Sequence, residues 1–191
     1  MKKMTTVLLT VCIVLLSGCA HFNKDKQEAA VTAQAVVNNT QDIQVDARTN
    51  PKTNLSGYKT YAWLGAAEAL NDPTKKWQPP KMDVTGDVKY LIDRELRQKG
   101  INSTTVDPDL AVAFVIGVDM DALELKDDPA TEGDVLENIP QGALIVALID
   151  VETGYAVWVG VAKANIVEGA SPELVRERLD YALSNMFDLL K

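Results

Sequence analysis

The first nineteen residues constrain how the rest of the chain can fold. Lys2 and Lys3 precede an apolar run over residues 7–16, and small residues then lead to Cys19. A basic start, a short apolar segment and small residues before a cleavage site are typical of a secretory signal peptide. Both cysteines of the chain, Cys12 and Cys19, lie in this segment. The rest of the sequence has no thiol for a disulfide, a metal site or a nucleophile, so it must fold on its hydrophobic core alone.

The tetrapeptide Leu16-Ser17-Gly18-Cys19 resembles a bacterial lipobox. In that motif the cysteine receives a diacylglycerol, and cleavage between Gly18 and Cys19 frees an amino group for a further acyl chain. A transmembrane anchor would need about 20 apolar residues, more than residues 7–16 provide. An ordinary signal peptide with an incidental cysteine is the other alternative. We expect lipidation at Cys19, because two small residues stand between Leu16 and the cysteine. Two or more acyl chains would then anchor the protein stably.

The residue after the predicted lipidation site bears on location. In enteric bacteria an aspartate there favours the inner membrane, whereas this chain has Ala20. We therefore expect an outer-membrane lipoprotein that faces the periplasm, with the inner membrane as the alternative.

The charge balance argues against two classes of partner. The chain has 19 basic and 27 acidic residues, a net charge of −8. Removal of residues 1–18 takes away Lys2 and Lys3 and brings the net charge near −10. Nucleic-acid-binding proteins carry clustered Lys and Arg, and so do segments held on anionic lipid by charge. We expect neither partner, and the lipid anchor supplies the attachment to the membrane.

With residues 1–19 interpreted as a lipoprotein signal, the sequence predicts three regions: a signal peptide over residues 1–18, a lipid-anchored flexible tether over 19–41 and a single domain over 42–191. The tether is rich in Ala, Gln, Asn, Lys and Thr. As a flexible chain it would reach about 25 Å from the membrane.

Apolar alternation predicts the strands of the domain. Ile43 and Val45 suggest a first strand, and with residues 57–64 they predict a hairpin over 42–64. Residues 65–81 are predicted as a loop. The stretch 109–120 places large apolar residues on one face and small ones on the other, which predicts a strand covered by helices on one side.

Two further strands and two helices complete the pattern. Residues 143–150 and 155–167 flank the turn Glu152-Thr153-Gly154 and predict a hairpin. Apolar residues at helical spacing predict a helix that ends at Gly100, with Ile101 packing back on Leu96 as in a Schellman motif, and a last helix capped by Ser171-Pro172-Glu173. The fold predicted is a two-layer α+β domain with a mostly antiparallel five-stranded sheet, two helices on one face and the order ββαβββα.

Six short motifs, taken together in their order and spacing, resemble bacterial envelope lipoproteins known as domain of unknown function 4136. The motifs are Tyr58-Lys59-Thr60-Tyr61-Ala62-Trp63, Leu96-x-x-Lys99-Gly100, Asp107-Pro108-Asp109-Leu110-x-Val112, Gly142-x-Leu144-x-Val146, Asp150-x-x-Thr153-Gly154 and Trp158-x-Gly160. The similarity spans about residues 42–190. It implies a fold and an envelope location, and no reaction.

Acidic residues give two candidate sites. Asp107-Pro108-Asp109 could be paired carboxylates for acid–base chemistry, but a turn leading into a strand is the favoured interpretation. Residues 119–137 contain eight acids and one base, and they could bind calcium weakly. Their spacing does not match the twelve-residue calcium loop, so a solvated acidic loop is the favoured interpretation.

The three tryptophans are candidates for ligand stacking. Trp63 and Trp158 lie in predicted strands, and packing within the sheet or core is the favoured role. Trp77 lies in a proline-flanked loop beside Lys75 and Lys76, which makes it the tryptophan most suited to contact a partner.

No pattern in the sequence predicts catalysis. The only histidine, His21, lies two residues after Cys19, and there is no Gly-rich phosphate loop, no paired histidines for zinc and no GxSxG motif. We expect no cofactor and no metal. The leading hypothesis is a non-enzymatic module that docks an unidentified envelope protein, with the strand at 43–45 accepting a partner's strand. The alternative is binding or processing of cell-wall sugars or lipids in a groove near Trp77.

Overall fold

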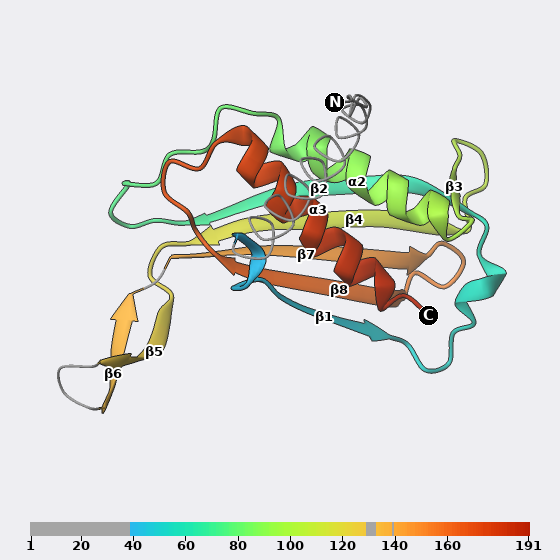
Figure 1. Cartoon of the computed structure of the whole chain (residues 1–191). Coiled ribbons are helices and arrows are strands. Elements are labelled where there is room, and N and C mark those ends of the chain that lie inside the picture. Colours follow the sequence, from blue (N-terminus) through green and yellow to red (C-terminus); the bar gives the residue numbers. More distant parts are fainter. Residues whose placement is uncertain (1–38, 129–132, 139) are drawn as a thin grey trace, which may run out of the picture. The chain divides into compact units, whose positions relative to one another are not determined.

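The computed structural model describes residues 39–128, 133–138 and 140–191 (Figure 1). Lipidation at Cys19, cleavage after Gly18 and most of the predicted tether lie outside the described residues, so they stay predictions.

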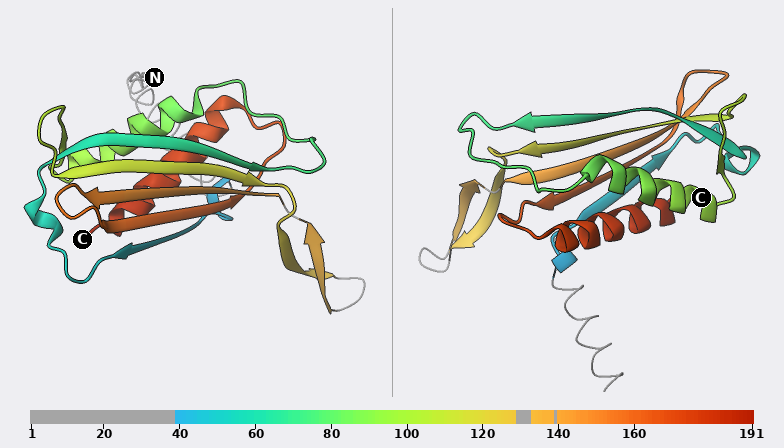
Figure 2. Two further views of the ribbon diagram at one scale, coloured as in Figure 1. Left: turned by 180° about the vertical axis from the view of Figure 1, so that it is seen from behind. Right: turned by 90° about the horizontal axis from the view of Figure 1, so that it is seen from above.

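Two helices pack on one face of a mixed six-stranded sheet (Figure 2). The sheet order is β1-β8-β7-β4-β2-β3, and β5 and β6 form a separate two-stranded sheet. The elements are β1 (Gln44–Thr49), the 3-10 helix η1 (Leu55–Gly57), β2 (Thr60–Asn71), α2 (Val84–Gln98), β3 (Asn102–Ser103), β4 (Leu110–Asp119), β5 (Leu123–Asp128), β6 (Gly133–Asn138), β7 (Gln141–Asp150), β8 (Ala156–Asn165) and α3 (Pro172–Asp188). The predicted α+β class with two helices is confirmed.

The predicted five-stranded, mostly antiparallel sheet needs correction in its detail. The sheet has six strands, and β2 runs parallel to both β4 and β3. Part of the acidic segment 119–137, which the sequence suggested was a loop, forms the β5–β6 hairpin. Parallel neighbours need a long crossover connection, and α2 supplies the one between β2 and β4.

The predicted hairpin over 42–64 is wrong. β1 pairs antiparallel with β8, whereas β2 pairs with β4. The strands β8, β7 and β4 therefore lie between β1 and β2 in the sheet. The turn-rich residues between them connect distant strands, because turn chemistry says that the chain bends and does not say which strand it meets.

The predicted loop over 65–81 begins too early, because β2 continues to Asn71. Residues 65–71 are rich in alanine, which is depleted in strands. They are held by a continuous parallel ladder to β4, from Gly65 opposite Ala113 to Asn71 opposite Asp119. Tertiary pairing overrides local propensity here.

The helix ends and the last hairpin are confirmed. Gly100 has φ 80°, and the Ile101 N–H donates to the Leu96 carbonyl at 2.9 Å, the long bond of a Schellman motif. Ser171 Oγ accepts from the Leu174 N–H at 3.3 Å and caps α3. Gly154 has φ 73° in the β7–β8 turn.

The core lies between the sheet and the C-terminal halves of both helices. Trp158 of β8 packs against Phe187 of α3, with ring centroids 5.1 Å apart. Arg94 of α2 joins the helices, because it donates to Asp180 and, at 2.9 Å, to Ser184 Oγ of α3. The side chains buried at this end include Leu96, Leu110, Val112, Leu148, Leu183 and Met186.

Candidate functional site

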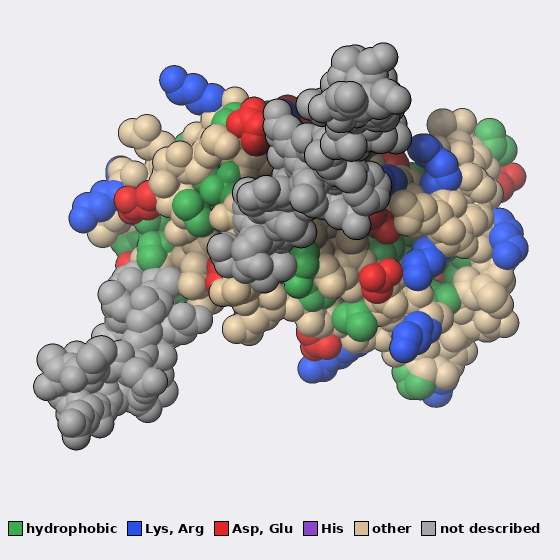
Figure 3. All heavy atoms as spheres, viewed as in Figure 1, with side chains coloured by type: hydrophobic (Ala, Val, Ile, Leu, Met, Phe, Trp, Pro, Cys, Tyr) green, Lys and Arg blue, Asp and Glu red, His purple; other side chains and the backbone are tan. Residues whose placement is uncertain are grey.

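A groove of about 1340 Å³ lies at the end of the sheet where both helices begin. Its walls come from the ends of β2, β4 and β8, the start of β7, the first turns of α2 and α3, and the loops before those helices. We call it the Trp77 groove, lined by Leu70, Trp77, Met82, Ile116, Val118, Met120, Leu144, Ala164, Ile166, Val175 and Leu179, among others. Apolar side chains reach the surface at this end of the domain in Figure 3, with charged ones beside them.

Two features of the chain leave this space open. A ten-residue strand such as β4 is about 33 Å long, whereas the 15 residues of α2 give a helix of about 22 Å. The helices therefore cover only part of the strands' length. Small residues line this end, where larger ones would fill the space: Gly142, Ala162 and Ala164.

The lining is largely aliphatic. Ile116 continues the inward face that Val112 and Phe114 bury further along β4, yet Ile116 is only half-buried. Leu70, which lies opposite Val118 in the ladder, is 56% exposed. Apolar surface that the core covers at one end of the sheet is thus available to a ligand at the other end.

Trp77 is fixed in the groove wall by its own loop. The backbone N–H of Trp77 donates to Asp72 Oδ2 at 2.7 Å, and Thr74 Oγ1 donates to Asp72 Oδ1 at 2.9 Å. Desolvation opposes the ionised form, but these hydrogen bonds outweigh it and lower the pKa of Asp72. Trp77 is half-buried, so it presents only part of its surface.

The other two tryptophans have the packing roles that the sequence suggested. Trp158 is buried in the core. Trp63 is half-buried, packs edge-to-face on Phe114 and donates through Nε1 to Asp93 Oδ1 at 3.2 Å.

The rim of the groove holds the first described residues of the chain. Arg178 of α3 lines the groove and donates to both carboxylate oxygens of Asp42, at 2.9 and 2.7 Å, and to the Asn39 carbonyl. Burial opposes ionisation of Asp42, but the hydrogen bonds from Arg178 outweigh it and lower the pKa of Asp42. Ile43 is itself part of the lining. The chain therefore begins its course through the domain beside the groove.

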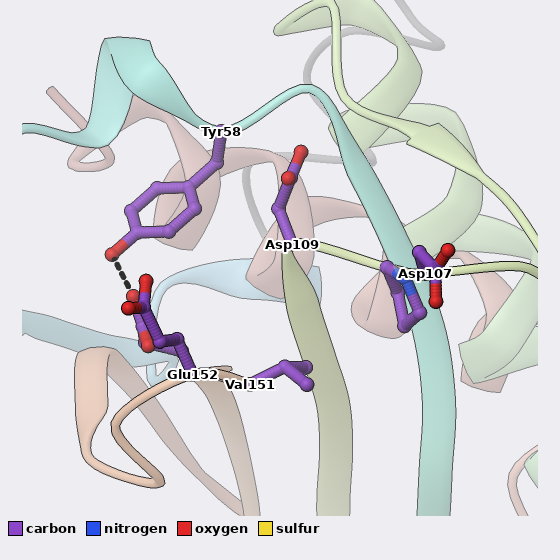
Figure 4. A pocket seen from close by; sticks show the side chains of 7 residues that line it. Tyr58, Asp107, Asp109, Val151 and Glu152 are labelled. Carbon is purple, nitrogen blue, oxygen red and sulfur yellow. Dashed lines mark hydrogen bonds between the residues drawn. The ribbon is translucent and has the colours of Figure 1, made fainter.

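A smaller cavity of about 330 Å³ lies at the opposite end of β4, and Asp107, Asp109 and Asp150 line it (Figure 4). The Tyr58 hydroxyl donates to Asp150 Oδ2 at 2.6 Å. This hydrogen bond, with desolvation and the negative charge of Asp150, raises the pKa of Tyr58 to about 12. The same bond lowers the pKa of Asp150, together with donors in the β7–β8 turn.

Asp109 connects the starts of two strands. Its Oδ2 accepts from the Lys59 N–H at 2.8 Å, from the Thr60 N–H at 2.8 Å and from Thr60 Oγ1 at 2.9 Å. These donors, the Lys59 N–H first, lower the pKa of Asp109. Asp107 adopts φ 44° in the turn that precedes β4. The structure favours the turn interpretation of Asp107-Pro108-Asp109, because Asp109 is occupied in joining β2 to β4.

The described residues contain no group of three or more His, Cys, Asp or Glu side chains that could hold a metal ion. Side chains of residues 123–139 are outside the description, so calcium binding by the acidic segment stays a prediction. None of the helices described here is long and apolar enough to cross a membrane.

The family model for the domain of unknown function DUF4136 matches residues 45–189. The chain belongs to this family. The family's description assigns no activity. No match is found among curated proteins.

Several solved structures resemble the chain. A DUF4136 family protein from Bacteroides thetaiotaomicron has a TM-score of 0.50 at 11% identity, with 77% of this chain and 95% of that chain covered. At this identity the likeness concerns the fold alone. The PelC dodecamer from Paraburkholderia phytofirmans gives a TM-score of 0.40 at 15% identity, covering 75% and 96%. Lipoprotein GNA1162 from Neisseria meningitidis gives a TM-score of 0.37 at 11% identity, covering 68% and 97%.

The sequence pointed to Trp77 and missed most of the groove around it. The floor comes from the ends of β4 and β8 and the start of β7, which meet only in the folded sheet. Apolar strand ends that carry small residues, such as Gly142 and Ala164, were the signal in the sequence.

Proposed function

We propose that this protein is a lipid-anchored, non-enzymatic envelope protein whose domain binds an acyl chain of a membrane lipid in the Trp77 groove. The observation that carries the proposal is an open groove of about 1340 Å³ with a largely aliphatic lining. Pockets for drug-sized ligands span about 300–1,000 Å³, so the space suffices for a long acyl chain.

The chemistry of the lining favours lipid over sugar. Each methylene taken from water into an apolar site contributes about 0.8 kcal/mol, so a chain of many methylenes gains steadily along the groove. A sugar needs hydrogen-bonding partners for its hydroxyls, and buried polar groups without partners are unfavourable. Aliphatic residues such as Ile116, Leu144 and Leu179 supply no such partners and form most of the lining, which also includes polar side chains such as Glu68 and Lys76.

The start of the domain supports a ligand taken from the membrane. Arg178 and Ile43 both line the groove, and Arg178 binds Asn39 and Asp42. The predicted tether from Cys19 joins the domain at these residues. The reach of about 25 Å predicted for this tether would keep the groove within a short distance of lipid.

A titration tests the proposal. The mature chain carrying Cys19→Ser is mixed with a fluorescent fatty acid, and the dissociation constant is measured by the change in emission. Ala164→Phe places a ring in the groove, because Ala164 is on the inward side of β8 and lines the groove. We expect affinity to fall at least tenfold, about 1.4 kcal/mol. The matched control is Ala156→Phe, the same change at an exposed position at the other end of β8, which we expect to bind as the parent does.

Two outcomes would count against acyl-chain binding. One is a parent chain that does not bind the probe, and the other is equal binding by the parent and Ala164→Phe. Displacement of the probe by a muropeptide, but not by phospholipid, would favour the sugar alternative instead.

The docking hypothesis for β1 is a second candidate, because β1 is an edge strand of the sheet. Its pairing with β8 leaves the other edge of residues 44–49 for a partner's strand. Replacement of Val45 by proline removes one backbone donor, and loss of an envelope protein crosslinked to the parent chain would support this interaction.

A further inference from the structure

The sheet face opposite the two helices is apolar across four strands. The left view of Figure 2 shows this face toward the viewer, with both helices behind the strands. Strand register aligns its outward side chains in four rows: Ala62, Ala111, Ile149 and Ala156; Gly65, Ala113, Ala147, Val159 and Arg48; Ala67, Val115, Ile145, Val161 and Asp46; and Ala69, Gly117, Ala143, Lys163 and Gln44. In these rows the charged residues belong to β8 and β1, at one side of the face.

This pattern is unlike that of a sheet face exposed to water. Antiparallel strands with one solvated face usually alternate apolar and polar residues, and monomers rarely expose a large continuous apolar patch. Here Val115 is 38% exposed and its neighbour Ile145 is 40% exposed. Both faces of β4 and β7 are apolar, as in strands that are covered on both sides.

The size of the face matches what a stable interface needs. The strands β2, β4, β7 and β8, about 4.8 Å apart and about ten residues long, cover roughly 19 Å by 33 Å, and the six residues of β1 bring the whole face to about 700 Å². Specific interfaces bury about 800 Å² on each partner. An apolar centre with charges at one rim also matches the usual anatomy of such interfaces.

We infer that this face binds a second copy of the chain, sheet against sheet, around a two-fold axis. The row containing Val115, Ile145 and Val161 forms a ridge, and the rows on either side of it are made largely of alanine and glycine. A ridge on one copy can lie over a small-residue row on the other, because a two-fold interface uses the same patch twice.

Charge also favours a second copy here. The chain has a net charge of −8, and most of its surface would repel another copy. The four rows contain one acidic residue, Asp46 on the edge strand β1, and Arg48 occupies the neighbouring row on the same strand. Two copies can therefore meet on this face without opposing acidic groups at its centre.

Thiol crosslinking tests the dimer. The full chain, expressed with its own signal, carries Val115→Cys, and the only other cysteines are Cys12 and Cys19. Isolated membranes are treated with a short bis-maleimide crosslinker, because facing sheets lie about 10 Å apart and the two Val115→Cys thiols need not be in direct contact. We expect a band of twice the protomer mass, several-fold stronger than in the parent. Tyr90→Cys is the control, because Tyr90 is 69% exposed on α2, on the other side of the sheet.

Sedimentation equilibrium gives a second measurement. The mature chain carrying Cys19→Ser should have the mass of a dimer at micromolar concentration, and Ile145→Lys should raise the dimer dissociation constant at least tenfold with an unchanged circular dichroism spectrum. A parent chain that stays monomeric at 100 µM overturns the inference. So does a Val115→Cys crosslink no stronger than that of Tyr90→Cys, or one whose mass belongs to a different protein.

Discussion

Replacing Gly160 with alanine tests how tightly β8 and α3 pack in the core. A Cβ at this position would lie inside van der Waals distance of the Met186 side chain and 2.5 Å from the ring of Trp158. Met186 and Trp158 are fully buried, so neither side chain has free space to move into. Overpacking of this kind costs about 1–3 kcal/mol. For a domain of this size the melting temperature should fall by about 2–4 °C per kcal/mol.

Urea denaturation followed by circular dichroism measures the loss. Gly65→Ala is the matched control, because a Cβ at Gly65 of β2 meets nothing within 4 Å. We expect this control to be neutral or slightly stabilising, since alanine loses less backbone entropy than glycine.

A double-mutant cycle with Met186→Ala identifies the clash as the cause. Met186→Ala alone should cost about 2–5 kcal/mol through its cavity. Together with Gly160→Ala, the total loss should be smaller than the sum by at least about 1 kcal/mol, because the new methyl occupies part of that cavity. A Gly160→Ala chain within about 0.5 kcal/mol of the parent, or strictly additive losses, would refute the reasoning.

Three further changes test other parts of the structure. Gly100→Ala should cost about 1–2 kcal/mol in urea denaturation, because alanine is strained at φ 80° although nothing crowds its Cβ. The pKa of Tyr58 is 10.0 in the unfolded chain and about 12 in the folded one, so its contribution to the free energy of unfolding is complete below pH 10 and is lost as pH rises towards 12. Tyr58→Phe should therefore reduce the fall in the free energy of unfolding between pH 10 and 12, measured by urea denaturation. Asp42→Asn should cost about 1.5–3 kcal/mol at pH 7 by leaving Arg178 without its carboxylate. Because the pKa of Asp42 in the folded chain lies below 3.8, this contribution is lost as pH falls below that value. The free energy of unfolding of Asp42→Asn should therefore fall less steeply in acid than that of the parent.

Features decided by neighbouring residues could be predicted from the sequence. The Schellman end at Gly100, the cap at Ser171 and the turn at Gly154 each depend on a few adjacent residues, and all three are confirmed. The strand over 109–120 was also clear, because its large residues alternate and the structure buries Leu110, Val112 and Phe114 together.

Features decided by distant partners could not be predicted. The sequence between β1 and β2 contains a turn, but β1 pairs with β8 and β2 pairs with β4, and both partners come much later in the chain. The β2 extension to Asn71 depends on its ladder with β4 in the same way. The groove follows from strands longer than the helices that cover them, a mismatch visible only when element lengths are compared in the folded domain.

The residues that carry the family resemblance mostly maintain the scaffold. Asp109 joins the starts of β2 and β4, Asp150 accepts from Tyr58 and the β7–β8 turn, and Gly160 makes room for Met186. The Trp77 groove takes only Gly142 and Leu144 from those motifs, and its other walls come from loops and strand ends. The residues that define the fold lie mainly at the end of the sheet away from the groove, so the lining of the groove can change without loss of the scaffold. Binding of the fatty-acid probe by this chain should then depend on residues such as Trp77 and Ala164, and substitutions at Asp109 or Asp150 should change stability before they change affinity.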